Sequence, residues 1–138
     1  MEIFSIIILL IYLYTFALYP VLLCLLSKII NKPVAASLDY LPELSLIMAA
    51  YNEESTIKDA IDSIFQSDYP AGKIKVFVGS DGSTDHTNEI LKSLKAKYPD
   101  LNYFEFERTG KNMLLNKIAK HIDSEIICFM DADCRVKS

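Results

Sequence analysis

The sequence predicts an α/β fold: an open, mostly parallel sheet with flanking helices, preceded by one transmembrane helix. Two observations carry this prediction. Residues 3–27 contain no charged side chain, and this apolar run is long enough for a helix to cross a bilayer. Beyond residue 43, short apolar runs alternate with amphipathic segments. That alternation is typical of strands joined by helices in right-handed parallel crossovers.

The composition excludes several other classes of protein. The 138 residues suffice for one domain, and a hydrophobic content of 51% excludes a chain that is mainly disordered. The net charge of −4 gives no basic surface for nucleic acid, so we expect no nucleic-acid partner. Three cysteines are too few, and odd in number, for a disulfide-based scaffold.

The flanks of the apolar run predict how it is oriented. Only Glu2 precedes it, whereas Lys28 and Lys32 follow it, so the positive-inside rule places the following domain in the cytosol. Pro20 predicts a kink. The alternative, a cleaved signal peptide, is disfavoured because the first residues lack positive charge and the apolar run is too long. We expect a single-pass membrane anchor over residues 3–27, with the α/β domain on the cytoplasmic side.

The elements of the domain follow from periodicity and from turn residues. Residues 28–42 contain two prolines and no periodic pattern, so they are interpreted as a linker, and the domain occupies residues 43–138. The predicted strands are 44–50, 74–79, 101–106 and 125–130. The predicted helices are 53–66, a second one capped by Ser83 or Thr84 and ending near residue 98, and a third one after Gly110.

Polar residues follow three of these four strands. Tyr51, Asn52 and Glu53 follow the first strand, Asp81 follows the second, and an Asp-x-Asp sequence at residues 131–133 follows the fourth. Open α/β sheets bind ligands beyond the carboxyl ends of their strands. One such carboxylate is compatible with a helix cap or a turn, but several at one edge repel unless a cation or hydrogen-bond donors offset them.

The Asp-x-Asp sequence is the most informative of these features. Asp131 and Asp133 are two residues apart, so in an extended backbone both carboxylates point to the same side. Magnesium typically takes one or two protein carboxylates and completes its shell with water and substrate phosphates. The sequence therefore predicts a divalent-cation site at this strand end.

Other nucleotide and phosphate motifs fit less well. A haloacid-dehalogenase-type phosphatase also carries Asp-x-Asp after a strand, but Arg135 stands where that pattern expects Thr or Val. Gly110-Lys111 does not complete a P-loop, because Glu105 and Asn112 occupy positions that require Gly and Ser or Thr. The sequence also lacks the Gly-x-Gly-x-x-Gly pattern of dinucleotide sites.

Four motifs together resemble the family 2 glycosyltransferases over residues 43–135. They are Ala-Ala-Tyr51-Asn52-Glu53, Ser80-Asp81-Gly82-Ser83-Thr84-Asp85, Gly110-Lys111 with Leu115-Asn116, and Asp131-Ala132-Asp133. Their order and spacing match the family. The apolar segment ahead of the domain is similar to that of processive, membrane-bound polysaccharide synthases.

The resemblance implies a GT-A fold, a Rossmann-like nucleotide-sugar-binding domain, and an activity. That activity is inverting transfer of a hexosyl group from a nucleotide-diphosphate sugar, commonly a UDP-sugar, to a glycan or lipid acceptor. The implied donor-binding residues are Tyr51, Asn52, Glu53, Asp81, Lys111 and Asp131. Asp131 and Asp133 would hold Mg²⁺ or Mn²⁺ against the diphosphate.

The chain departs from the family pattern in three respects, of which Leu114 in place of the more usual Ala should affect only packing. Ser80 stands where many members have Asp, a change that leaves the implied role of Asp81 intact. The family's general base lies well beyond the Asp-x-Asp sequence, so we expect this chain to hold the donor- and metal-binding half without that base. A complementary C-terminal half or subunit is then an expected partner. The alternative is a non-catalytic, membrane-anchored nucleotide-binding or partner-binding module from a truncated gene.

Overall fold

A computed structural model describes residues 2–30 and 40–137. The chain divides into two units, Met1–Leu38 and Asp39–Ser138, and each is described by itself. Residues 31–39 of the predicted linker lie outside the described residues, whereas Lys28 and Ile29 belong to the end of a helix.

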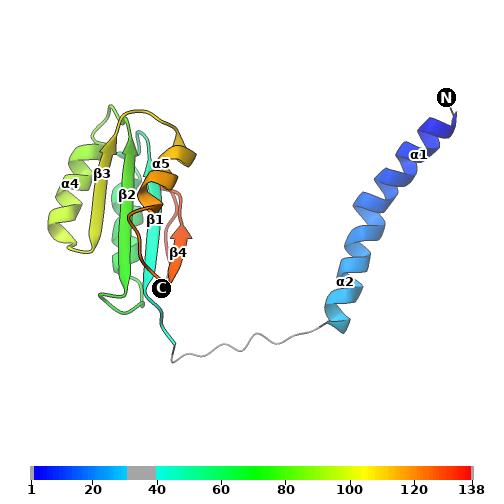
Figure 1. Cartoon of the computed structure of the whole chain (residues 1–138), viewed down its shortest axis with the longest axis horizontal. Helices are drawn as coiled ribbons and strands as arrows, with labels where there is room; N and C mark the ends of the chain where they lie inside the picture. The colour runs from blue at the N-terminus through cyan, green and yellow to red at the C-terminus, as the bar shows by residue number, and fades with distance from the viewer. Residues whose placement is uncertain (1, 31–39, 138) are drawn as a thin grey trace. The chain divides into compact units, whose positions relative to one another are not determined.

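The first unit is a helix that runs from Glu2 to Ile29. It consists of α1 (Glu2–Leu13), a π-helical turn η1 (Tyr14–Leu18) and α2 (Tyr19–Ile29) (Figure 1). With 28 residues and a mean hydropathy of 2.4 over its most apolar window, it is long and apolar enough to cross a membrane. The described residues contain one such helix.

A π-helical turn directly precedes Pro20, the residue at which the sequence predicts a kink. The Tyr19 N–H donates to the Tyr14 carbonyl, five residues back, instead of four. Proline has no N–H, and its ring clashes with the carbonyl four residues earlier. A wider turn just before Pro20 relieves this conflict without ending the helix.

The second unit is a four-stranded parallel sheet with helices on both faces. Its elements, in chain order, are β1 (Leu44–Ala50), α3 (Ile57–Phe65), β2 (Ile74–Asp81), α4 (Thr87–Lys97), β3 (Leu101–Phe106), α5 (Lys111–Ala119) and β4 (Ile126–Phe129). The strand order is β3-β2-β1-β4, and every pair is parallel (Figure 1). This confirms the predicted alternation of strands and helices in an open parallel sheet.

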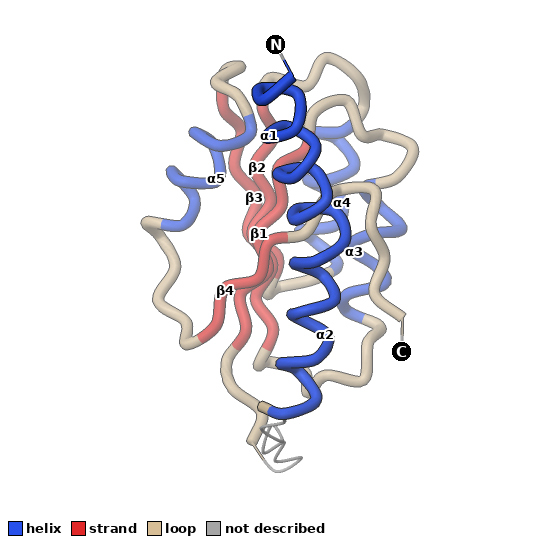
Figure 2. Tube along the Cα trace, turned by 90° about the vertical axis from the view of Figure 1, so that its right-hand side faces the viewer, coloured by secondary structure: helices blue, strands red, loops and turns tan. Residues whose placement is uncertain are grey.

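Alternate residues of β1 supply the two layers of the core. Leu46, Met48 and Ala50 are buried against α3 and α4, whereas Ile47 is buried on the opposite face, against α5. This division follows the two-residue period of a strand. Figure 2 shows α3 and α4 on one side of the sheet and α5 on the other. The bounds of β1 and β3 agree with the predicted strands.

Gly79 in β2 brings α5 close to the sheet. A Cβ atom at this position would lie 2.6 Å from the side chains of both Leu114 and Ile118. The missing side chain therefore lets α5 pack directly on β2. Because α5 begins at Lys111, this packing sets where that lysine stands at the carboxyl edge of the sheet.

Three predictions about α3, β2 and α4 were wrong, each for a local reason, and β4 is shorter by one residue at each end than the predicted strand 125–130. Helix α3 begins at Ile57 instead of Glu53, because residues 53–56 form a turn in which the Thr56 and Ile57 N–H groups both donate to the Glu53 carbonyl (3.1 and 3.0 Å). Strand β2 continues to Asp81, which pairs with Phe106 of β3.

The third correction concerns the predicted cap of α4. Neither Ser83 nor Thr84 caps this helix. The Asp85 carboxylate instead accepts a hydrogen bond from the Thr87 N–H (3.0 Å), at the start of α4.

A charged cluster centred on Asp62 fixes α3 to α4. Its carboxylate, only 13% exposed, accepts hydrogen bonds from Lys58 Nζ (2.7 Å), Lys97 Nζ (2.9 Å) and the Tyr98 hydroxyl (2.7 Å). Burial raises the pKa of Asp62, but the three donors outweigh that effect and the pKa is lowered from 3.8. The folded state therefore favours the ionised carboxylate.

We predict that Asp62→Asn destabilises the domain by about 1–2 kcal/mol at pH 7, because two lysines lose their counter-charge. Because folding lowers the pKa of Asp62, its carboxylate makes its full contribution to the free energy of unfolding above the unfolded-state pKa of about 4. This contribution is lost progressively as the pH falls below that value. Urea unfolding of both proteins at pH 7 and pH 3 measures the difference.

Asp59→Asn is the matched control, because Asp59 lies on the same helix but pairs with Arg135 at the surface (2.7 Å). Its effect should be much smaller. Equal destabilisation by the two variants would contradict the role given to Asp62. So would a difference in free energy of unfolding between wild type and Asp62→Asn that is as large at pH 3 as at pH 7.

Candidate functional site

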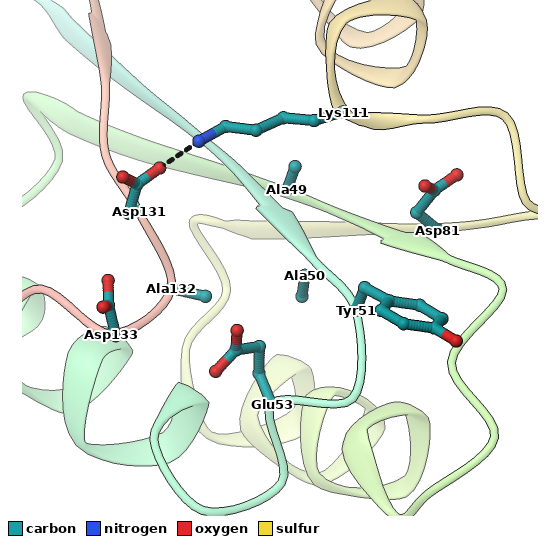
Figure 3. Close-up of a pocket in the computed structure, with 9 residues that line it drawn as sticks. All are labelled: Ala49, Ala50, Tyr51, Glu53, Asp81, Lys111, Asp131, Ala132 and Asp133. Atoms are coloured by element: carbon teal, nitrogen blue, oxygen red, sulfur yellow. Dashed lines mark hydrogen bonds and ion pairs between the residues drawn. The ribbon is translucent and has the colours of Figure 1, made fainter.

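A cavity of about 340 Å³ opens where β1, β2 and β4 end and α5 begins. We call it the strand-end cavity. Its lining residues are Ala49, Ala50, Tyr51, Glu53, Asp81, Lys111, Asp131, Ala132 and Asp133 (Figure 3). Six of the seven residues predicted from the sequence thus lie around one cavity. Three alanines in the lining keep the space between the polar side chains open.

One end of the cavity carries Lys111, Asp131 and Asp133. The Lys111 ammonium, on the first residue of α5, pairs with Asp131 Oδ1 (Figure 3). Both side chains are more than half exposed. The hydrogen bond to Asp131, followed by attraction to that carboxylate, raises the pKa of Lys111. The lysine therefore stays charged at neutral pH and can attract an anionic ligand.

The Asp131 and Asp133 pair stands just beyond the last residue of β4. The Met130 N–H donates to the Ile47 carbonyl (3.1 Å), so the chain stays beside β1 past the end of the strand. The Cys134 N–H then donates to the Asp131 carbonyl (3.1 Å), which closes a tight turn around the two carboxylates. This geometry keeps both carboxylates at the carboxyl edge of the sheet.

The donor set suits a magnesium or manganese ion that is completed by a ligand. The described residues hold no group of three or more His, Cys, Asp or Glu side chains that could enclose a metal. A closed, all-protein metal site is therefore not formed by them. Two exposed carboxylates match the way in which Mg²⁺ binds, through one or two carboxylates plus water and substrate phosphates.

Asp81 lies at the other end of the cavity and is nearly buried, with 5% of its surface exposed. Its Oδ1 accepts hydrogen bonds from the Thr109 N–H (2.6 Å) and the Gly110 N–H (3.2 Å), and Oδ2 accepts from the Gly110 N–H (3.0 Å). Burial raises the pKa of Asp81, but these donors and the nearby Arg108 charge lower it overall. Asp81 is therefore an ionised acceptor that also anchors the loop before α5.

Tyr51 forms an aromatic wall beside Asp81 (Figure 3). The Arg108 guanidinium carbon lies 3.2 Å from the centre of the Tyr51 ring. Arg108 was missed by the sequence analysis, which examined the ends of only three strands. The signal was available, because Arg108 follows β3 by two residues, as the other site residues follow their strands.

Glu53 and Asn52 have different positions. Glu53 lines the cavity, and its Oε2 accepts a hydrogen bond from Thr56 Oγ1 (2.7 Å). Asn52 is the predicted site residue that does not line the cavity. Its backbone has a positive φ of 54°, and its side-chain oxygen accepts from the Thr84 N–H (2.8 Å). Asn52 therefore joins the loops that follow β1 and β2.

These features define an α/β domain of the GT-A-like type, with a ligand cavity at the carboxyl edge of its sheet. The mannosyltransferase PcManGT from Pyrobaculum calidifontis, in complex with GDP-Man and Mn²⁺, superposes with a TM-score of 0.71 at 35% identity, covering 83% of this chain and 35% of that one. Residues 45–138 match the family described as glycosyl transferase family 2. The chain belongs to that family.

Other family relatives are similar over the same region. The beta-monoglucosyldiacylglycerol synthase of Synechocystis sp. is 33% identical over 98 residues, which are 69% of this chain and 20% of the relative. Staphylococcus aureus TarS 1–349 in complex with UDP-GlcNAc has a TM-score of 0.61 at 29% identity, covering 66% of this chain and 26% of that one. The chain spans about a fifth of the length of the curated relatives it matches.

We predict that Asp81→Asn loosens the loop before α5. Asparagine offers one acceptor oxygen in place of two. Its NH₂ group would face the Gly110 N–H, which in the wild type donates to the second carboxylate oxygen. Amide hydrogen exchange at Thr109 and Gly110 should become at least several-fold faster, while exchange in α3 stays unchanged.

Glu107→Gln is the control for charge loss in the same loop, because Glu107 is exposed and Asp81 alone accepts the Thr109 and Gly110 amides. Unchanged protection of these two amides in Asp81→Asn, or equal acceleration in both variants, would contradict the anchoring role.

Proposed function

We propose that this chain contributes the donor-binding part of an inverting, membrane-anchored glycosyltransferase, which transfers a hexosyl unit from a nucleotide-diphosphate sugar to a glycan or lipid acceptor. The observation that carries the proposal is the gathering of six predicted site residues around the strand-end cavity. Family membership and the nucleotide-sugar complexes of the structural neighbours support it.

The two ends of the cavity suit the two parts of such a donor. The diphosphate would lie at the end with Lys111, whose ammonium offsets phosphate charge as a compact cation. Asp131 and Asp133 would hold Mg²⁺ or Mn²⁺ there, and that ion would neutralise charge on the departing diphosphate. The nucleoside would lie at the end with Tyr51, Glu53 and Asp81, where Asp81 can accept an N–H of the base.

Asn52 takes a supporting role in this proposal. Its hydrogen bond to Thr84 joins the loops that carry Tyr51 and Asp81. It would therefore position these two residues without touching the donor. This replaces the direct contact with the donor that the resemblance implied.

The relatives support a choice of donor and acceptor in this proposal. The structural neighbours were solved with GDP-Man and with UDP-GlcNAc, and we favour a UDP-sugar here. Curated relatives are named as synthases of a glucosyldiacylglycerol and of a poly-N-acetylglucosamine, which favours a lipid or glycan acceptor. The apolar helix would act as the membrane anchor, and the lysines after it favour a cytoplasmic position for the domain.

A complementary polypeptide is the remaining partner in the proposal. β4 is an edge strand that pairs only with β1 among the described strands, and its apolar side chains stay exposed on the two faces of the sheet, 41% for Ile126 and 64% for Phe129. Apolar sheet edges of this kind pair readily with a further strand. The curated relatives are about five times longer than the shared stretch, and an equivalent half or subunit would supply the acceptor site and the general base.

The test is calorimetric titration of the full chain in detergent micelles with UDP and GDP, with and without Mn²⁺. We expect binding that requires Mn²⁺ and that weakens at least ten-fold in Asp133→Asn, because a metal ligand is lost. Asp123→Asn is the matched control, since Asp123 is exposed and precedes β4, at the opposite end of the strand.

Failure of both nucleotides to bind folded wild-type protein would overturn the proposal. Equal weakening by Asp133→Asn and Asp123→Asn would overturn the metal assignment. Metal-dependent binding without turnover of a UDP-sugar, even with the complementary polypeptide present, would instead favour the non-catalytic nucleotide-binding module.

A further inference from the structure

The chain that follows the Asp-x-Asp sequence is fastened to α3, and the proposed function gives this attachment no role. Arg135 Nη2 donates a hydrogen bond to Asp59 Oδ2 (2.7 Å), and the two side chains form an ion pair. The next residue, Val136, donates its N–H to Ser63 Oγ (3.0 Å). Asp59 and Ser63 are four residues apart, so they lie on one face of α3. We call these two contacts the α3 clasp.

Helix α3 is a firm support for the clasp. One face of the helix is buried in the core, including Ile61 and Ile64. The Ser63 hydroxyl donates to the Ala60 carbonyl (2.7 Å), so its proton points into the helix and its lone pairs are left for the Val136 N–H. The clasp therefore ties an exposed segment of the chain to a fixed point of the domain.

Asp133 depends on its backbone for its position. Asp131 is held through its side chain, by the pair with Lys111. The Asp133 carboxylate, in contrast, accepts no hydrogen bond and forms no ion pair within residues 2–30 and 40–137. It lines the strand-end cavity (Figure 3). The place of this carboxylate in the cavity is therefore set by the chain on either side of it.

The backbone is fixed both before and after Asp133. Before it, Ala132 is 4% exposed and packs in the core cluster that includes Ile57 of α3. After it, the Cys134 N–H donates to the Asp131 carbonyl (3.1 Å), and the clasp begins at the next residue. Without the clasp, only the buried alanine and this one hydrogen bond would hold the turn that carries the carboxylate.

The clasp adds little to the stability of the domain. The Arg135 and Asp59 side chains are 61% and 51% exposed, and exposed ion pairs contribute little to the free energy of unfolding. An ordered ligand nevertheless binds a metal more tightly than a mobile one, because less conformational freedom is lost when the ion binds. A surface pair can change such an equilibrium by up to about five-fold. An effect of this size suits a role in positioning rather than in folding.

We propose that Arg135 is a positioning residue for the divalent cation: through its pair with Asp59, it holds the turn that carries Asp133 in the arrangement that binds the ion. This inference rests on the proposed function, in which Asp131 and Asp133 are the metal ligands. Arg135 touches neither the cation nor the nucleotide in this role. It acts through the short stretch of backbone that joins it to Asp133.

Charge alone predicts the opposite result for Arg135. A guanidinium repels a nearby cation, so its removal without any change in order would tighten Mn²⁺ binding. Loss of the clasp would weaken Mn²⁺ binding. Removal of the Asp59 charge weakens binding under either explanation, so the substitution of Arg135 is the one that separates them.

The test measures Mn²⁺ binding to the full chain in detergent micelles, with UDP at a fixed concentration, from the electron paramagnetic resonance signal of the free ion. A sample without protein corrects for chelation by UDP. Arg135→Met and Asp59→Asn should each weaken Mn²⁺ binding about three- to five-fold, because either change breaks the same pair. The double variant should be no weaker than either single variant, because only one contact is lost. Arg135→Lys, which can still pair with Asp59, should recover most of the affinity.

Two further measurements and one control separate positioning from folding. Amide hydrogen exchange at Cys134 should be faster in Arg135→Met, whereas the free energy of unfolding in urea should stay close to that of wild type. Lys137→Met is the matched control, because Lys137 is two residues further along and lines a separate hollow beside Tyr69. It removes one positive charge from the same segment without breaking the clasp, and it should not weaken Mn²⁺ binding.

Several outcomes would overturn the inference. Unchanged or tighter Mn²⁺ binding in Arg135→Met would show that its effect is one of charge and not of position. Wild-type affinity in the double variant would show the same, because the two changes in charge cancel. Equal weakening by Lys137→Met, or clear destabilisation of Arg135→Met in urea, would show that the effect is not specific to the clasp. Each of these results leaves the proposed function standing, whereas no Mn²⁺ binding by wild type would overturn both.

Discussion

The parallel pairing of β1 with β2 on one side and β4 on the other is the constraint on which the rest of the structure depends. Parallel strands end at the same edge, so residues that follow them in the sequence are brought together in space. Ala50 is in register with Ser80, and the chain after β4 stays bonded to β1 through Met130. Asp81 and Asp131 therefore lie on either side of the end of β1.

Gathering carboxylates at one edge has an electrostatic cost, and the structure meets it differently for each group. Asp81 is nearly buried and is stabilised by backbone N–H groups of the loop before α5. Asp131 is exposed and is paired with the Lys111 ammonium. A carboxylate held by fixed backbone donors suits recognition of a neutral group, whereas exposed carboxylates beside an exposed lysine suit exchangeable cations and phosphates.

The cavity is consequently asymmetric. One end combines a cation with two exposed carboxylates, and the other combines an aromatic ring, a nearly buried acceptor and an arginine. An asymmetric ligand with a charged part and a planar polar part is complementary to this arrangement. The close packing of α5 on Gly79 joins the two ends, because the loop before α5 is anchored to Asp81 and the first residue of α5 is Lys111.

The sequence by itself determined the strands, their order between helices, and the strand-end position of the residues that line the cavity. These depend on local patterns: apolar runs such as residues 44–50 and a pair of aspartates two apart. Tertiary structure alone decided that Asn52 ties two loops together, that the Asp85 carboxylate accepts a hydrogen bond from the first N–H of α4, and that Arg108 stacks on Tyr51. Asn52 and Thr84 are 32 residues apart, so their contact depends on which loops the parallel sheet brings side by side, and no local pattern records that.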